Sequence, residues 1–515
     1  MLRVSPLHGS LNQFSGRQSG QVVPSPSPVK ASTPDSFERV QFGITKMPPL
    51  PVFTDLERQQ VHDVSEDYKR FLKTAVCGPL TAKAIIERAQ AKGFKPLPEK
   101  GRVKPGEKYY IANGLESVAL VTIGKRDPKI SGFNIVGAHI DSPQLELKPD
   151  PDYASRGMMK LKTKVRGGIL MDSWKDKPLG IAGRIFTPLR DAEGRPQLDP
   201  DTLIPLMKEA FVQFDSPALV IPRVPPHLLK GQNDGVKTNP ENDLAVLAAI
   251  EQADFTQQIR AVFASKGIDI DDLSGAELYL YPAVPPTDAL LDSADGSAII
   301  AQGHDDRAMT YTAMEGLFEA AESTGSDGPE KTGIAFFFNN EENGSLNRGG
   351  ARAQFPLSVA GKVLRLQTGR WAHNIPERET ALEKSFIFSA DVAHSWEPSQ
   401  KRYHDEQNAV QMGYGPAIKA DTDGHYATTA EGIAKSRVIG QAAGVPMQVY
   451  STNQDIPCGT TIGPFIASGT SALTVDIGIP ILGMHSALEV AAKRDVYYAQ
   501  KLFASFYRND PPKAN

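Results

Sequence analysis

The amino-acid sequence predicts an α/β fold that is interrupted by a mostly β domain, and three observations carry this prediction. Short, very apolar runs such as FNIVGA, IAFFF and FIFS are typical of buried parallel strands. Segments with helical periodicity lie between such runs, for example Asp306–Ser323. From about residue 150 to 275, strand-like pieces instead alternate with loops rich in Pro and charge.

Length and composition limit the class of protein. A chain of 515 residues exceeds one ordinary core, so we expect two or three domains. The hydrophobic content of 40% is typical of a globular protein. The net charge of −4 does not indicate the excess of basic residues that binding to nucleic acid would need. No apolar stretch approaches the roughly 18–20 residues that cross a bilayer. With only two cysteines a reducing compartment is favoured, and we expect a cytoplasmic protein.

The segments follow one another in a clear order. Residues 1–48 are rich in Ser, Pro, Gly and Gln, which predicts a mobile tail, although basic residues without an early acid also resemble an organellar transit peptide. Two amphipathic helices are predicted within residues 61–93, followed by strands that lead to His139. We therefore expect the α/β domain at 49–149 and 276–515, and the β-rich insert at 150–275.

Five side chains that could bind a metal each follow a short apolar run. They are His139, Asp305, Glu342, Asp391 and His485. Loops at the carboxyl ends of parallel strands converge on one crevice, so we expect these side chains to meet. Two His and three carboxylates suit a pair of divalent metals with one bridging carboxylate. The pattern therefore favours metal-dependent hydrolysis.

Most of these motifs also have a structural explanation. His139 could be a core histidine, and Asp141 could either accept its N–H or cap a turn. Asp305 and Asp306 precede a helix, so either could be its N-cap.

The adjacent pair Glu341-Glu342 is the most specific signal. Neighbouring side chains point in different directions, so one can bind metal while the other acts as general base on a metal-bound water. His394 could reach the same pocket and contact substrate. In the loop NQDIPCGTTIGP, backbone N–H groups near Gly459 could hold a substrate carbonyl, whereas Cys458 is better explained as a small buried thiol than as a nucleophile.

Taken in order, these motifs resemble the aspartyl aminopeptidase family of dinuclear zinc metallopeptidases, which includes vacuolar aminopeptidase I. The resemblance covers residues 60–507 and is strongest in GAHIDSPQLELKP, NNEENGSLNRGGA, SADVAH, NQDIPCGTTIGPFIASG and TVDIGIPILGMHSALE. It implies a mixed-sheet, three-layer α/β/α zinc-peptidase domain. It also implies that the insert mediates assembly into a homo-oligomer, commonly a tetrahedral dodecamer.

The resemblance further implies two Zn²⁺ ions per subunit, with Co²⁺ or Mn²⁺ as substitutes. One ion would be bound by His139, Asp305 and Asp391. The other would be bound by Asp305, Glu342 and His485, so that Asp305 bridges the pair.

Four more positions acquire roles from the resemblance. Glu341 matches the general base, and Asp141 matches the carboxylate that orients His139. His394 and Lys419 match positions that contact substrate.

Two departures from the family pattern place the chain in a divergent, bacterial-type branch. The usual run Asp-His-Glu-Glu is Asn339-Asn340-Glu341-Glu342 here. The insert carries RGGILMDSW where better-known members have a Trp-His-Thr-Trp core whose histidine completes a neighbouring subunit's site. Asp172 therefore stands at the histidine position, and an acid in place of a potential cation near the substrate weakens the expectation that N-terminal Asp or Glu is preferred.

The function expected from the sequence is a metal-dependent aminopeptidase that acts on peptides through a zinc-activated water. Two alternatives remain open at this point. One is a related dinuclear carboxypeptidase or deacylase, and the other is a catalytically silent, self-assembling shell protein.

Overall fold

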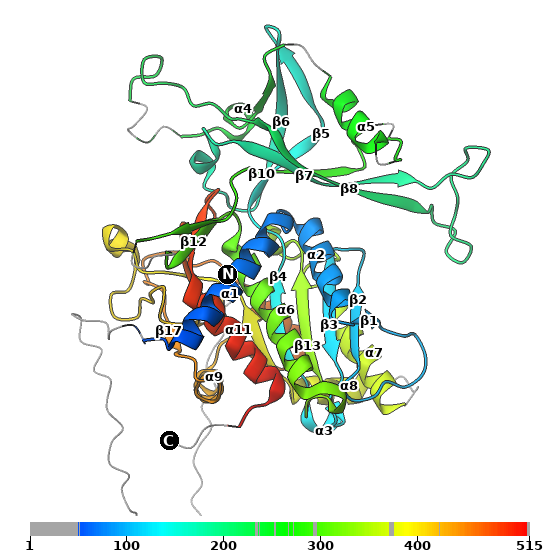
Figure 1. Cartoon of the computed structure of the whole chain (residues 1–515), viewed down its shortest axis with the longest axis vertical. Coiled ribbons are helices and arrows are strands. Elements are labelled where there is room, and N and C mark those ends of the chain that lie inside the picture. Colours follow the sequence, from blue (N-terminus) through cyan, green and yellow to red (C-terminus); the bar gives the residue numbers. More distant parts are fainter. Residues whose placement is uncertain are drawn as a thin grey trace, which may run out of the picture. The chain divides into compact units, whose positions relative to one another are not determined.

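The computed structural model describes residues 50, 52–231, 235, 237–251, 254–265, 267–270, 272–291, 296–369, 375–421 and 423–511 (Figure 1). The tail expected at residues 1–48 lies outside these residues. Among the helices that are described, none combines the length and the apolar character that a membrane span requires.

The largest sheet has nine strands, and its centre is parallel. Across the sheet the strands are β1 (Lys95–Pro96), β2 (Lys108–Ala112), β3 (Ser117–Thr122), β13 (Gly333–Phe338), β4 (Asn134–His139), β14 (Phe386–Ala390), β18 (Leu473–Gly478), β16 (Ala417–Lys419) and β17 (Gln448–Tyr450). Strands β13, β4, β14 and β18 are parallel neighbours, whereas β3 and β16 join them in antiparallel fashion. The predicted mixed sheet is thereby confirmed, and the three apolar runs form β4, β13 and β14.

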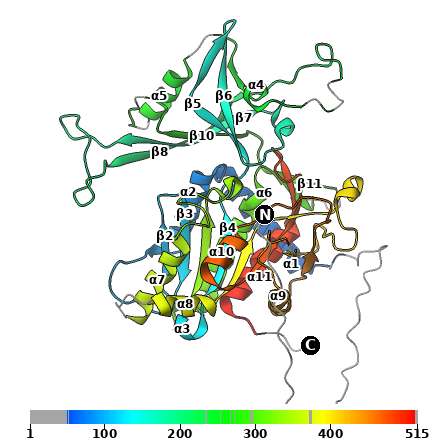
Figure 2. The same cartoon turned by 180° about the vertical axis from the view of Figure 1, so that it is seen from behind.

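Helices cover both faces of this sheet. Successive strand residues point to opposite sides, so buried strands present apolar side chains to a helical layer on each face. Val136 of β4 packs in one core with α1 (Asp55–Thr74), α2 (Gly78–Ala91), α6 (His304–Thr324) and α11 (Lys493–Arg508). Its neighbour Ile135 packs in the other core with α7 (Phe355–Thr368), α8 (Ile375–Glu383) and α10 (Gly463–Thr470). Figures 1 and 2 show the two helical layers from opposite sides. The three-layer arrangement is as predicted.

A second sheet of six strands carries the β-rich character of the predicted insert. Its order is β8 (Met207–Leu219), β7 (Leu179–Pro188), β10 (Ala276–Pro282), β5 (Gln144–Ser155), β6 (Met158–Arg166) and β9 (Val246–Ala249), and every neighbouring pair is antiparallel. Helix α5 (Phe255–Ala264) packs on it through Phe255, Ile259 and Phe263. The sheet spans Gln144 to Pro282, so it extends beyond both boundaries expected from the sequence.

A third sheet of five short strands was not predicted. It contains β11 (Thr287–Ala289), β12 (Ala298–Ala301), β20 (Glu489–Ala492), β19 (Pro480–Leu482) and β15 (Ala393–His394). Two of its connections matter for the positions of the predicted ligands, because α6 begins shortly after β12 and residues 483–488 join β19 to β20.

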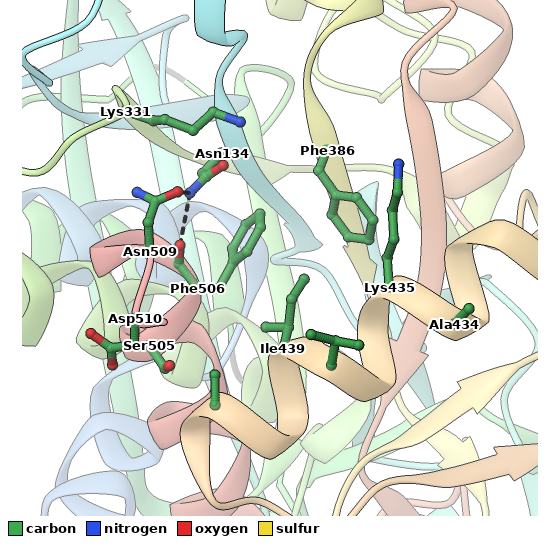
Figure 3. A pocket seen from close by; sticks show the side chains of 12 residues that line it. Asn134, Lys331, Phe386, Ala434, Lys435, Ile439, Ser505, Phe506, Asn509 and Asp510 are labelled. Carbon is green, nitrogen blue, oxygen red and sulfur yellow. Dashed lines mark hydrogen bonds between the residues drawn. The ribbon is translucent and has the colours of Figure 1, made fainter. Parts of the chain in front are cut away.

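A cavity of about 500 Å³ opens at the amino ends of β4 and β14, where each strand starts (Figure 3). Its walls are mainly apolar side chains of α9 (Ala430–Ala443) and of the last turn of α11. The predicted ligands instead follow the carboxyl ends of these strands. The cavity is therefore not the predicted metal site.

Candidate metal and catalytic site

The five predicted metal ligands converge on one place. His139 Nε2 lies 3.2 Å from Asp305 Oδ1, and His485 Nε2 lies 3.2 Å from Asp305 Oδ2. Asp391 joins the group of His139 and Asp305, and Glu342 joins the group of Asp305 and His485; within each group the candidate ligand atoms lie within 4.8 Å of one another. Asp305 thus stands between two sets of ligands, with one oxygen turned to each imidazole.

Two different sheets supply these side chains. Three positions follow parallel neighbours of the nine-stranded sheet: His139 ends β4, Glu342 follows β13 in a short 3₁₀ helix (Glu341–Asn343), and Asp391 follows β14. The other two lie in segments that adjoin strands of the five-stranded sheet. Asp305 lies in the first turn of α6 with a non-helical backbone, and His485 lies between β19 and β20 with φ 66°.

Hydrogen bonds to backbone carbonyls fix the orientation of both imidazoles. His139 Nδ1 is 3.0 Å from the carbonyl oxygen of Asp141, and His485 Nδ1 is 2.9 Å from that of Gly168. A carbonyl can only accept, so each Nδ1 carries a proton, and Nε2 is the ring nitrogen left to face Asp305.

A lone pair facing a carboxylate oxygen at 3.2 Å is repulsive unless a proton or a cation lies between them. Zinc–ligand bonds of about 2.0–2.1 Å at tetrahedral angles place neighbouring ligands about 3.3 Å apart. The N···O distances at Asp305 therefore fit a zinc ion on each side.

The charge of the site also calls for cations. Three buried carboxylate oxygens of the site have no hydrogen-bond partner among the described residues, namely Oδ1 of Asp305, Oδ1 of Asp306 and Oε1 of Glu342. Burial raises the pKa of Glu341 to about 8, and the nearby carboxylates of Asp391 and Asp141 add to the rise. Buried acids without partners are costly, so this donor set suits divalent metal ions, which would neutralise it.

Asp141 supports the site in a different way from the one expected. The carbonyl oxygen of Asp141 accepts the His139 hydrogen bond, while its carboxylate oxygen stands 3.6 Å from the ring nitrogen. The carboxylate instead accepts the backbone N–H of Glu341 at 3.1 Å and of Glu342 at 3.3 Å. Asp141 thereby fixes both the imidazole and the loop that carries the paired glutamates.

Two supporting carboxylates were not predicted in this role. Glu489 of β20 accepts the backbone N–H of Asp305 at 3.0 Å and of His485 at 2.7 Å. Asp306 accepts the backbone N–H of His139 at 3.0 Å and does not cap α6, whose N-cap is Gly303. Their only sequence signal is proximity to a ligand, because their partners are backbone groups.

Of the predicted substrate-contacting residues, Lys419 pairs directly with a candidate metal ligand. Lys419 is buried, and its Nζ is 3.4 Å from Asp391 Oδ2. The ring of Tyr426 lies 5.5 Å from Lys419 Nζ, and its hydroxyl is 2.9 Å from Sγ of Cys458, which precedes the exposed Gly459. His394 ends β15, and its ring centroid is 6.5 Å from that of Tyr450.

The segment after β6 borders the metal site of its own chain. Gly167 N–H donates to Asn343 Oδ1 at 3.1 Å, and Leu170 N–H donates to the His485 carbonyl at 2.9 Å. Asp172, which stands at the position of the family histidine, pairs with Arg223 at 2.9 Å and with Lys175 at 3.5 Å.

Comparison of the sequence with models of known protein families assigns the chain to one of them. The family model described as "Aminopeptidase I zinc metalloprotease (M18)" matches residues 71–507. The chain belongs to the M18 aminopeptidase family. The resemblance seen in the sequence is thus confirmed, and this M18 aminopeptidase is a peptidase of the zinc metalloprotease class.

Individual relatives agree with that assignment. A "Probable M18 family aminopeptidase 2" of Pseudomonas entomophila strain L48 is 30% identical over 446 residues, which are 85% of this chain and 96% of the relative. The protein of the same name from Pseudomonas putida strain F1 is 31% identical over 449 residues, with the same coverage. These names give no support to the carboxypeptidase, deacylase or shell-protein alternatives.

Solved structures share the fold. The crystal structure of an M18 aminopeptidase from Thermotoga maritima has a TM-score of 0.75 and 28% identity, over 90% of this chain and 99% of that one. The structure of an S. cerevisiae mApe1 dodecamer has a TM-score of 0.70 and 23% identity, over 88% of this chain and 97% of that one.

Proposed function

We propose that this M18 aminopeptidase removes the N-terminal residue of peptides at a dinuclear zinc site. His139, Asp305 and Asp391 bind one ion; Asp305, Glu342 and His485 bind the other. One observation carries the proposal: each carboxylate oxygen of Asp305 faces the Nε2 of a different imidazole at 3.2 Å, and each imidazole is tied through Nδ1 to a carbonyl. A bridging carboxylate needs this placement.

When bound, the two zinc ions polarise the substrate carbonyl and lower the pKa of a water molecule. Glu341 accepts a proton from the attacking water and passes it to the leaving amine. Its Oε2 is 4.0 Å from His139 Nε2, so its carboxylate borders the ligand sets while Asp141 holds its backbone. The proposed contacts for substrate are Lys419, His394 and the loop at Gly459. We expect the protein to be located in the cytoplasm.

The substitution Glu341→Gln tests the proposed base. It keeps the size of the side chain but cannot accept the proton, so kcat on amino-acid anilides should fall by at least about 10²-fold. Zinc content, measured by inductively coupled plasma mass spectrometry, should stay close to two ions per chain. Glu431→Gln, an exposed glutamate on α9, is the matched control. Full activity in the Glu341 variant would place the base elsewhere, and loss of zinc would make Glu341 a ligand.

We also propose that the insert at 150–275 mediates assembly into a homo-oligomer, with twelve subunits as the expected count. The connection between β7 and β8 and the first residue of β8 expose large apolar side chains, from 40% to 69% of their surface: Leu189, Leu198, Leu203, Ile204 and Met207. Figure 1 shows this connection extending from the six-stranded sheet. Several large apolar side chains exposed on one connection are a feature of surfaces that bind another protein.

A further inference from the structure

The insert contributes one buried cation to the loop that carries the paired glutamates. Arg166 is the last residue of β6, and its side chain is only 12% exposed. One terminal nitrogen of its guanidinium donates to Asn340 Oδ1 at 2.5 Å and to Asn339 Oδ1 at 3.2 Å. The same nitrogen is 3.5 Å from Asp141 Oδ2. Arg166 therefore contacts a residue just before Glu341 as well as the acid that supports it.

Asn340 forms the turn that directs Glu341 towards the metal ligands. Its φ of 64° lies in the left-handed region, which residues other than glycine rarely adopt, although Asn adopts it more readily than most. Such a conformation persists only where surrounding contacts hold it. Within the described chain, the hydrogen bond from Arg166 anchors the Asn340 side chain.

Asp141 is the second support that Arg166 contacts. Both of its carboxylate oxygens accept backbone N–H groups of the glutamate pair. The carboxylate is 2% exposed, and a buried charge of this kind requires a counter-charge or hydrogen bonds. The Arg166 guanidinium supplies positive charge, and it lies 5.8 Å from the ring of Tyr279, on β10 of the insert.

We propose that Arg166 is a positioning residue, through which the insert holds Glu341 of its own chain in the geometry that catalysis needs. The inference rests on the proposed role of Glu341. It gives the insert a second task besides assembly, because the guanidinium acts within one chain. Loss of the contact should affect turnover more than substrate binding, because the Arg166 guanidinium contacts Asn339, Asn340 and Asp141 of its own chain.

The main experiment compares Arg166→Met, Arg166→Lys and the parent enzyme. Met keeps an unbranched apolar stem but removes the donors, so kcat should fall by about 10–10²-fold, the scale expected from a displacement of about 1 Å at a catalytic group. KM, zinc content and the mass of the assembly should stay close to those of the parent. Lys keeps the positive charge, so Arg166→Lys should recover part of the lost kcat. The recovery should be incomplete, because one ammonium group reaches fewer of the three oxygens than the guanidinium does. Arg260→Met, an exposed arginine on α5 of the insert, is the matched control.

Two further measurements separate positioning from simple packing. If Arg166 acts through Asn340, then Asn340→Ala should lower kcat in the parent but add little to Arg166→Met, which a double-mutant cycle detects. Methylguanidinium should restore turnover to Arg166→Ala, whereas methylammonium should restore less. Backbone amides of residues 339–343 should exchange hydrogen faster in Arg166→Met, a readout that does not depend on activity.

Several results would overturn the inference. Parental kcat and parental amide exchange in Arg166→Met would show that the contact does not position Glu341. A raised KM with unchanged kcat would make Arg166 a substrate-binding residue, and loss of zinc or of assembly would make it a structural one. Failure of the proposed function is a separate result, because it appears as full turnover in Glu341→Gln, whatever Arg166→Met does.

Discussion

At the scale of single residues, Asp305 has the central position in the candidate metal site. Its two oxygens face two imidazoles whose other nitrogens are already committed to backbone carbonyls. Glu489 holds the backbone N–H of Asp305 and of His485, so that the carboxylate and one of its facing imidazoles share one support. The Asp305 backbone and both imidazoles are thus held by other groups of the protein, which favours a preformed site.

Asp141→Asn should impair the enzyme although Asp141 is not a proposed ligand. An amide has one oxygen in place of two, so it can accept only one of the N–H groups of Glu341 and Glu342, and its NH₂ group would face the other. We expect kcat/KM to fall by about 10–100-fold, the scale for residues that support metal ligands. Steady-state kinetics and zinc titration measure the effect. Asp127→Asn, which caps α3 (Pro128–Ser131) with the same residue type, should leave both quantities unchanged.

The five proposed ligands and Glu341 could be found in the sequence because each is a metal-binding or acidic residue directly after an apolar run. Glu489 and Arg166 could not, since their partners are backbone groups or residues distant in sequence. The role of the Asp141 carbonyl could not be predicted either. Which oxygen of a residue accepts a hydrogen bond depends on the local backbone path, and His-x-Asp spacing does not specify that path.

At the scale of elements, the length of the apolar runs decided what could be predicted. Strands β4, β13 and β14 have five or six residues and are almost wholly buried, so their sequences are distinctive. The five-stranded sheet has strands of two to four residues, too short to show a period of two. Its existence, and hence its contribution of Asp305 and His485 from a separate sheet, had to come from the structure.

The turn that follows β6 gives a test at this scale. Gly167 has φ 69°, and a Cβ there would lie 3.0 Å from Glu342 Cβ and 3.2 Å from Glu342 Oε2. We therefore expect Gly167→Ala to displace Glu342 and to weaken zinc binding by about tenfold or more, in line with other changes next to metal ligands. Gly157→Ala is the control, because Gly157 has φ 85° but no heavy atom within 4 Å of its added Cβ. Equal zinc affinity in both variants would contradict the prediction.

At the scale of the whole molecule, the exposed apolar residues between β7 and β8 predict assembly. The mass in solution, measured by light scattering, should exceed the 55.8 kDa of one chain several-fold. Leu203→Glu should lower that mass, because a charge buried at an interface is costly without a partner. Ile130→Glu alters an equally exposed apolar residue outside the insert and should not. A parent enzyme that is monomeric and active would refute the assembly proposal.

Metal removal should destabilise the whole fold, because the proposed ligands join the nine-stranded and five-stranded sheets. A ligand that binds only the folded state at 100 times its dissociation constant adds about 2.7 kcal/mol to the free energy of unfolding. We expect a chelator to lower the melting temperature in differential scanning calorimetry and zinc to restore it. A melting temperature that does not change with metal content would show that the cluster does not bind ions strongly.

The split origin of the ligands also has a consequence for the time at which activity can begin. His139 is made early and His485 late, yet both must face Asp305. A nascent chain that has not yet exposed residues 480–492 lacks the strands β19 and β20, the His485 ring and the Glu489 support. The chemistry that cleaves peptides is thus withheld until nearly all of the described chain has left the ribosome.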